Sequence, residues 1–107
     1  MSLFDIKKVD LITESPQDNE FNLVIVIEKD EWINPNKFKL NFQEKIINYV
    51  MYIKDGQMQR EYPESIGKKI SITIFSTTEI PKQYLKIIKI MKKKLKNYDI
   101  DLKTIIS

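Results

Sequence analysis

The sequence predicts an α+β domain of two layers, in which two helices cover one face of a small mixed sheet. Two observations support this. β-Branched runs at Phe21–Glu28 and Ile70–Ile74 indicate strands, and apolar residues recur at helical spacing after Pro35 and after Pro81. The expected order is β-β-α-β-α, with a short final strand. At 107 residues the chain is too short for two separate cores, so we expect one domain over residues 1–107.

The first two predicted strands form a hairpin. Val9–Thr13 is a short strand candidate, and Ser15–Asn19 has proline in its second position among polar residues, which indicates a turn. Phe21–Glu28 follows and is apolar on both faces. Such a segment is typical of a central strand.

The second strand needs a cover on each face. Within Leu23–Ile27 the side chains alternate, so Val24 and Val26 point away from the three larger residues of this run. The predicted helices cover one face only. We expect either the segment after Gly56 or a second copy of the protein to cover Val24 and Val26, which makes them a candidate dimer face.

The first predicted helix begins at Asn34-Pro35 and ends before Gly56, where a helix favours a left-handed residue. Its apolar positions recur at helical spacing: Phe38, Phe42, Ile46, Tyr49, Val50 and Ile53.

After the strand Ile70–Ile74, a second helix is predicted over Pro81–Tyr98. Its buried stripe consists of Tyr84, Ile88, Met91, Leu95 and Tyr98. Its opposite stripe consists of Lys82, Lys86, Lys89, Lys93 and Lys96. A last, short edge strand is expected at Ile100, Leu102 and Ile106.

Several classes of chemistry lack their residues in this chain. It has no histidine and no cysteine, which excludes disulfides, thiolate zinc sites, cysteine nucleophiles and histidine bases. The acidic run Glu28–Glu31 lacks the glycine of a calcium loop, so we interpret it as a solvated loop. The carboxylates Asp55, Glu61 and Glu64 would offer acid–base chemistry, but loop carboxylates are usually solvated. We expect no catalytic residue, no metal site and no cofactor.

The lysine stripe raises the hypothesis of nucleic-acid binding, since lysines at this spacing would contact phosphates. The net charge of +3 is modest, the helix contains no arginine, and its tyrosines lie on the predicted buried stripe. Nucleic-acid surfaces usually recruit arginine and interleaved aromatic residues. We therefore keep nucleic-acid binding as the disfavoured alternative, with Lys82, Lys86, Lys89, Lys93 and Lys96 as its phosphate contacts.

The connector from Gly56 to Gly67 holds both glycines and the only arginine. We interpret the glycines as a helix stop and a strand start. The residues between them present mixed polar and aromatic groups that suit a protein partner. The candidate partner-binding residues are Gln57, Arg60, Glu61 and Tyr62, together with Trp32, which is either a lid on the core edge or an exposed anchor.

Composition also bears on the cellular setting. The longest apolar run, Leu23–Ile27, is far too short to span a bilayer, and Phe4–Asp10 alternates charged with apolar residues, unlike a signal peptide. The richness in isoleucine, lysine and asparagine, without alanine, suggests an AT-rich bacterial genome. We expect a bacterial, cytoplasmic protein without membrane contact.

Four short motifs follow one another: a helix with a Gln-x-Lys step and a tyrosine, then Gly-Gln, Tyr-Pro and Gly-Lys before a strand. They lie in Phe42–Tyr49, Asp55–Met58, Tyr62–Glu64 and Gly67–Lys68. In these motifs the chain resembles a family of small bacterial domains of unknown function, and the likeness runs over about residues 7 to 102. Phe42 stands where the family has leucine, which a core tolerates. The resemblance implies an architecture and no activity.

These observations lead to one functional hypothesis. We expect a non-enzymatic protein that acts through contact with an unknown protein partner, as accessory or immunity-type proteins do, and that forms a homodimer over Val24 and Val26. The analogy to such proteins is one of size and plainness alone.

Overall fold

A computed structural model of the protein describes residues 11–33 and 35–106, without the side chains of residues 30, 31 and 35–37. The elements, with η for a 3-10 turn, are β1 (Leu11–Ser15), η1 (Pro16–Asp18), β2 (Glu20–Ile27), α1 (Lys29–Trp32), α2 (Pro35–Lys54), α3 (Gln57–Glu61), η2 (Pro63–Ser65), β3 (Lys69–Ser76), α4 (Lys82–Leu95), η3 (Lys96–Tyr98) and β4 (Ile100–Ile106).

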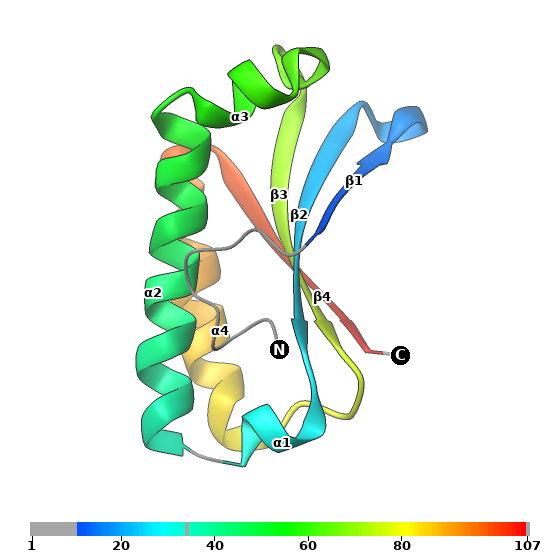
Figure 1. The fold of residues 1–107 in the computed structure, drawn as a ribbon. Coiled ribbons are helices and arrows are strands. Elements are labelled where there is room, and N and C mark those ends of the chain that lie inside the picture. Colours follow the sequence, from blue (N-terminus) through cyan, green and yellow to red (C-terminus); the bar gives the residue numbers. More distant parts are fainter. Residues whose placement is uncertain (1–10, 34, 107) are drawn as a thin grey trace.

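The four strands form one mixed sheet in the order β1-β2-β3-β4. β1 pairs antiparallel with β2, whereas β2, β3 and β4 run parallel. The two long helices, α2 and α4, lie on the same side of the sheet (Figure 1). The predicted α+β class, two-layer architecture and element order are therefore confirmed.

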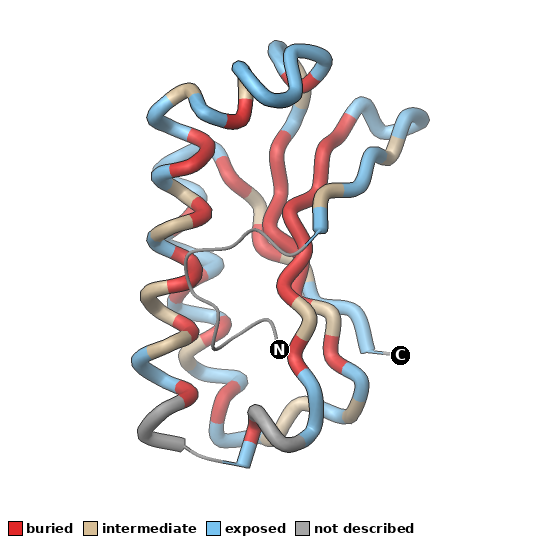
Figure 2. Tube along the Cα trace, viewed as in Figure 1, coloured by how far each residue is buried: buried red, intermediate tan, exposed pale blue. Residues whose placement is uncertain are grey.

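The core lies between the helices and the facing side of the sheet. Strand register places Leu23 beside Ile72 and Ile25 beside Ile74, and all four side chains are fully buried. Figure 2 shows the buried positions along the central strands and on the inner sides of both helices. The alternation in β2 and β3 puts these residues on one face, which explains why a two-layer core forms here.

The hairpin forms as predicted, and its first strand continues two residues beyond the predicted end. The described part of β1 is Leu11–Ser15, and Val9 and Asp10 of the predicted strand lie outside the described residues. Pro16 opens the 3-10 turn, and Asn19 closes it with a φ of 54°. β2 is central, as expected, because it pairs on both sides.

Aromatic side chains close the end of the core near α1. The Trp32 indole nitrogen donates to the Ser76 hydroxyl at 3.1 Å, and the Tyr84 hydroxyl donates to the Trp32 carbonyl at 2.7 Å. Phe38 packs against both rings, with centroid distances of 4.7 Å to Trp32 and 4.2 Å to Tyr84. Trp32 is only 2% exposed, so it is a lid on the core and not the exposed anchor that was the alternative.

Residues 29–32 and the end of the second predicted helix also differ from the sequence prediction. Lys29–Trp32 forms the short helix α1 where a solvated loop was expected. α4 ends at Leu95, and Tyr98 is 50% exposed instead of buried. The chain turns back at Asp99, whose φ is 63°, so Tyr98 lies at the rim of a cavity instead of over the sheet.

The connector is more regular than predicted. It forms α3 and η2 across one end of the two layers, and its Met58 is fully buried in the core (Figure 1). Gly56 and Gly67 have φ angles of +86° and +79°, as a helix stop and a strand start require. None of residues 56–67 lines the hollow beside Val24 and Val26. The connector therefore does not cover that face, and the alternative in which it covers Val24 and Val26 is wrong.

Substitution of Gly67 by alanine tests the need for a left-handed residue. A Cβ atom there would meet no atom within 4 Å, so strain in the backbone is the only cost. We expect Gly67→Ala to lower the free energy of unfolding by about 1 kcal/mol, because L-residues disfavour this conformation. Gly67→Asn should cost less, since asparagine tolerates it. Urea denaturation measures both, and an unchanged stability of the alanine variant would contradict the assignment.

Candidate functional site

The structure brings three of the predicted partner-binding residues together and separates the other two. Gln57, Glu61 and Tyr62 line a groove of about 680 Å³ between β1 and the C-terminal half of α2. Arg60 is exposed and does not line this groove. Trp32 lies near the opposite end of the molecule, in α1 (Figure 1). The five residues therefore do not form one surface.

Hydrogen bonds within the groove occupy the carboxylate of Glu61. Gln57 donates its amide to one oxygen at 3.0 Å, and the Tyr52 hydroxyl donates to the other at 2.8 Å. These bonds, that from Gln57 first, hold the pKa of Glu61 below its usual value. Burial, together with Glu61, raises the pKa of Tyr52. We call Tyr52, Gln57 and Glu61 the clamp, because they hold α3 against α2. The ionised carboxylate of Glu61 is unsuited to act as a proton donor near neutral pH.

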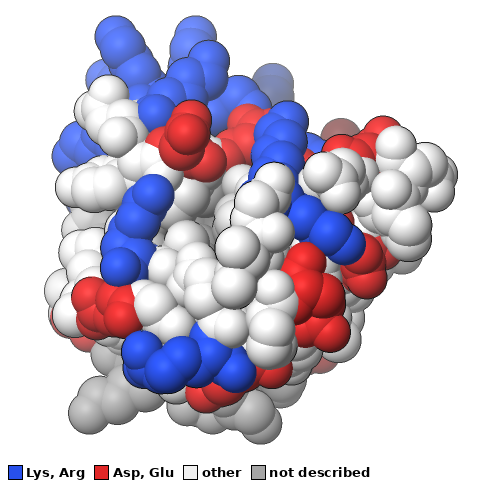
Figure 3. Space-filling model, turned by 90° about the horizontal axis from the view of Figure 1, so that it is seen from above, with Lys and Arg blue, Asp and Glu red and all other residues white. Residues whose placement is uncertain are grey.

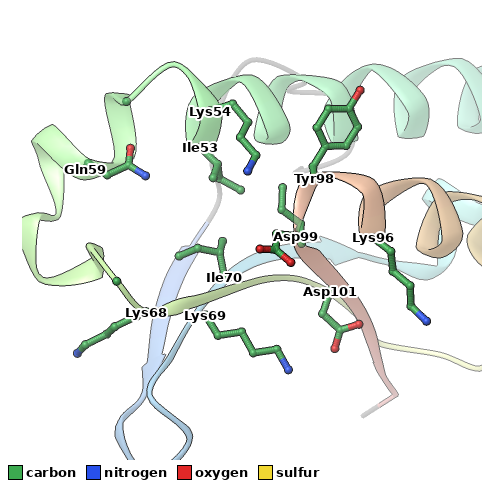
Figure 4. A pocket seen from close by; sticks show the side chains of 13 residues that line it. Ile53, Lys54, Gln59, Lys68, Lys69, Ile70, Lys96, Tyr98, Asp99 and Asp101 are labelled. Carbon is green, nitrogen blue, oxygen red and sulfur yellow. The ribbon is translucent and has the colours of Figure 1, made fainter.

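A cavity of about 970 Å³ lies where β3 and β4 begin (Figure 4). Gly56 and Gly67 both line it, although the connector separates them in sequence. It therefore lies at the amino ends of the parallel strands. Ligands in open α/β sheets bind at the carboxyl ends of such strands, so the location is not that of a typical ligand site.

Two of the charged side chains that line this cavity form ion pairs with residues that do not line it. Lys68 pairs with Glu14 at 2.6 Å, and Figure 4 shows its side chain pointing away from the centre. Asp101 pairs with Lys92 at 3.3 Å. Burial opposes ionisation of Asp101, but its bonds with Lys92 prevail and lower its pKa. Within residues 11–33 and 35–106, no three His, Cys, Asp or Glu side chains gather as a metal site would require.

The side of the sheet that faces away from α2 and α4 has an apolar half. Strand register places Leu11 beside Val24, and it places Phe75 between Val26 and Ile105. These residues line a shallow hollow of about 500 Å³. Val24 is nearly buried by its neighbours, whereas Leu11 and Ile105 at the two edges are about half exposed. We call this surface, with its polar half described next, the open sheet face.

The polar half of the open sheet face is closed by a hydrogen-bonded network. Ser71 donates to the Asn22 side-chain oxygen at 2.5 Å, and the Asn22 amide donates to Ser15 at 3.1 Å. Lys103 pairs with Glu20 at 2.5 Å, which carries its side chain from β4 across β3 to β2. This crossing is consistent with the complete burial of Ser71.

Glu20 is the most deeply buried carboxylate of this network, with a side chain only 2% exposed. Lys69 lies 3.9 Å from its second oxygen, which is too far for a hydrogen bond. That oxygen has no hydrogen-bond partner in the described part of the chain. Lys103 is therefore the group on which the buried charge mainly depends.

All five lysines of the predicted stripe are exposed: Lys82, Lys86, Lys89, Lys93 and Lys96. Seen from above, basic side chains gather along one margin of the molecule, and elsewhere they mix with acidic ones (Figure 3). The stripe is not uniform in its surroundings, however. Lys86 lines a groove against α2, and Lys96 lines the cavity that also contains Asp99 and Asp101.

Sequence reasoning missed the two edges of the open sheet face and its ion pair. Alternation in β3 and β4 would have placed Phe75 and Ile105 on the side of Val26, because a strand repeats every two residues. No local pattern indicates that Lys103 reaches Glu20, which lies far away in the sequence. That contact exists only because β3 brings β2 and β4 together.

Comparison with known proteins identifies the family. A family model described as a family of unknown function, DUF6572, matches residues 1–107. The chain belongs to this family. The match confirms the resemblance to a small domain of unknown function. Neither the curated proteins nor the solved structures include a match to the chain.

Removal of the Lys103 charge tests the buried ion pair. We expect Lys103→Met to lower the free energy of unfolding by about 2 kcal/mol, because Glu20 is left charged and buried. Adding Glu20→Gln should recover at least half of the loss. The control is Lys92→Met, whose partner Asp101 is more exposed; it should cost less than about 1 kcal/mol. Equal losses in urea denaturation for the two lysine variants would contradict this account.

The hydrogen bonds to Glu61 predict a pH dependence. Its pKa in the folded state lies below the ordinary value of 4.5, so the clamp stabilises α3 above that pH and is lost as pH falls through the folded pKa. We expect Gln57→Ala to raise the pKa of Glu61 more than Tyr52→Phe does. NMR titration of the Glu61 side chain measures this, with Gln59→Ala as the control. A pKa unchanged by both substitutions would refute the clamp.

Proposed function

We propose that the protein is a non-enzymatic interaction module of the bacterial cytoplasm that associates with a second copy of itself through the open sheet face. In the described residues, no helix is long and apolar enough to cross a bilayer. The proposal rests chiefly on one observation: within residues 11–33 and 35–106, helices lie on one side only of the three parallel strands.

Parallel strands favour this proposal because their sheets are nearly always covered on both faces. Here the residues of the second face include Val26 and Phe75, at intermediate exposure, and the half-exposed Leu11 and Ile105. A second sheet packed about 10 Å away would remove these side chains from water. That burial is the driving force expected for association.

Charge supports a second copy as the occupant. The chain has a net charge of +3, so two copies repel one another in general. The open sheet face differs from the lysine stripe of α4, because its Lys103 is paired with the carboxylate of Glu20, which Lys69 also approaches. Two copies meeting through this face avoid the lysines of α4.

Nucleic-acid binding through α4 has weaker support. Lys92 pairs with Asp101, and Lys96 borders a cavity that contains two aspartates. Lys86 lines the groove against α2, so the five lysines of the stripe do not share one environment. A salt-dependent electrophoretic shift is the behaviour that such binding would require.

Self-association is tested with two neighbouring residues on opposite faces of β4. Ile105 and Ile106 are 49% and 51% exposed, and Ile105 alone is on the open sheet face. We expect sedimentation equilibrium to give about twice the 12.8 kDa chain mass. Ile105→Lys should weaken dimerisation at least about tenfold, because it places a charge in the interface, and Ile106→Lys less than about threefold.

Circular dichroism checks that both variants fold. A protein that stays monomeric up to roughly several hundred micromolar would overturn the proposal. So would equal weakening by the two substitutions, since a contact through the open sheet face involves Ile105 and excludes Ile106.

A further inference from the structure

A second groove lies on the outer surface of the helix layer, between α2 and α4. Its volume is about 770 Å³. Tyr84 and Met91 form its buried floor, Ile87 is partly buried there, and Ile90 is 44% exposed at its wall. The groove is separate from the open sheet face, which lies on the other side of the sheet.

The rim of the groove is basic. Lys39 lines it from α2, and Lys86 and Lys94 line it from α4. No acidic side chain of the described residues lines it, and its other polar lining groups are the amides of Gln43 and Gln83 and the hydroxyl of Tyr84. An occupant that matches this groove would place negative charges against its lysines and apolar groups against Ile87 and Ile90.

The dimensions of the groove suit a helix. From Gln83 to Lys94, α4 extends about 16 Å, or about three turns. Gln83, Ile87, Ile90 and Lys94 follow one another at the spacing of a single helical stripe, so the apolar positions lie between polar ends. An amphipathic helix recognises such a surface with residues spaced three and four apart.

We propose that this groove binds an acidic amphipathic helix of a partner protein. Apolar side chains on one face of that helix would cover Ile87 and Ile90, and aspartate or glutamate residues beside them would pair with Lys39, Lys86 and Lys94. The site differs from the surface for self-association and does not depend on it.

The test uses a fluorescein-labelled helical peptide with leucines at i, i+3, i+4 and i+7 and glutamates elsewhere. Its counterpart has lysines in place of the glutamates. We expect saturable binding of the acidic peptide, with a dissociation constant on the order of 100 µM or lower, and none of the basic peptide. Fluorescence anisotropy measures both.

Matched charge reversals locate the site. Lys86→Glu with Lys94→Glu changes the groove, whereas Lys89→Glu with Lys93→Glu changes the net charge equally on α4 residues that do not line it. We expect the first pair to weaken binding at least about tenfold and the second pair less than about threefold. Ile90→Ser should weaken binding more than Leu85→Ser, since Leu85 is similarly exposed but lies outside the groove.

Other outcomes contradict the proposal. No saturable binding up to about 1 mM, a value that corresponds to negligible specific affinity, would overturn it. Equal losses for the two double variants would show attraction to the lysine-rich surface as a whole, as a nucleic acid would also produce. Ile105→Lys should leave peptide binding unchanged, so failure of self-association and failure of this proposal are distinguishable.

Discussion

The apolar face that β2 and β3 present to the helices is the constraint on which the rest of the structure depends. Leu23, Ile25, Ile72 and Ile74 are fully buried there, in register with one another. Both strands are parallel and central, so each needs a crossover helix to reach the next strand. The helices α2 and α4 serve as these crossovers, and both lie on the same side of the sheet.

The two ends of the core are closed by different means. Near α1 the closure is aromatic, since Trp32 packs on Phe38 and Tyr84 and donates to Ser76. At the other end the connector covers the core with Met58. Neither the aromatic cluster nor the connector covers the second face of the sheet, because each lies at one end of the helix-covered layer. The open sheet face therefore follows from the topology.

The surfaces that remain differ in charge. The open sheet face is apolar in one half and carries the ion pair between Glu20 and Lys103 in the other. The groove between α2 and α4 joins an apolar floor to a basic rim. We propose these two surfaces as the sites of self-association and of helix binding. Their opposite placement would let one chain bind two partners at once.

The sequence by itself determined the class, the element order, the glycine turns and the exposed lysines, because these depend on local periodicity and backbone preference. It favoured the lid interpretation of Trp32, but the burial of this residue depends on Ser76 and Tyr84. Only the tertiary structure decided that burial, the exposure of Tyr98 and the pairing of Lys103 with Glu20. The connector also became ordered helix, with Gln57, Glu61 and Tyr62 gathered against α2 and Arg60 apart from them. These features join residues distant in the chain, and no local pattern records which strands and helices become neighbours.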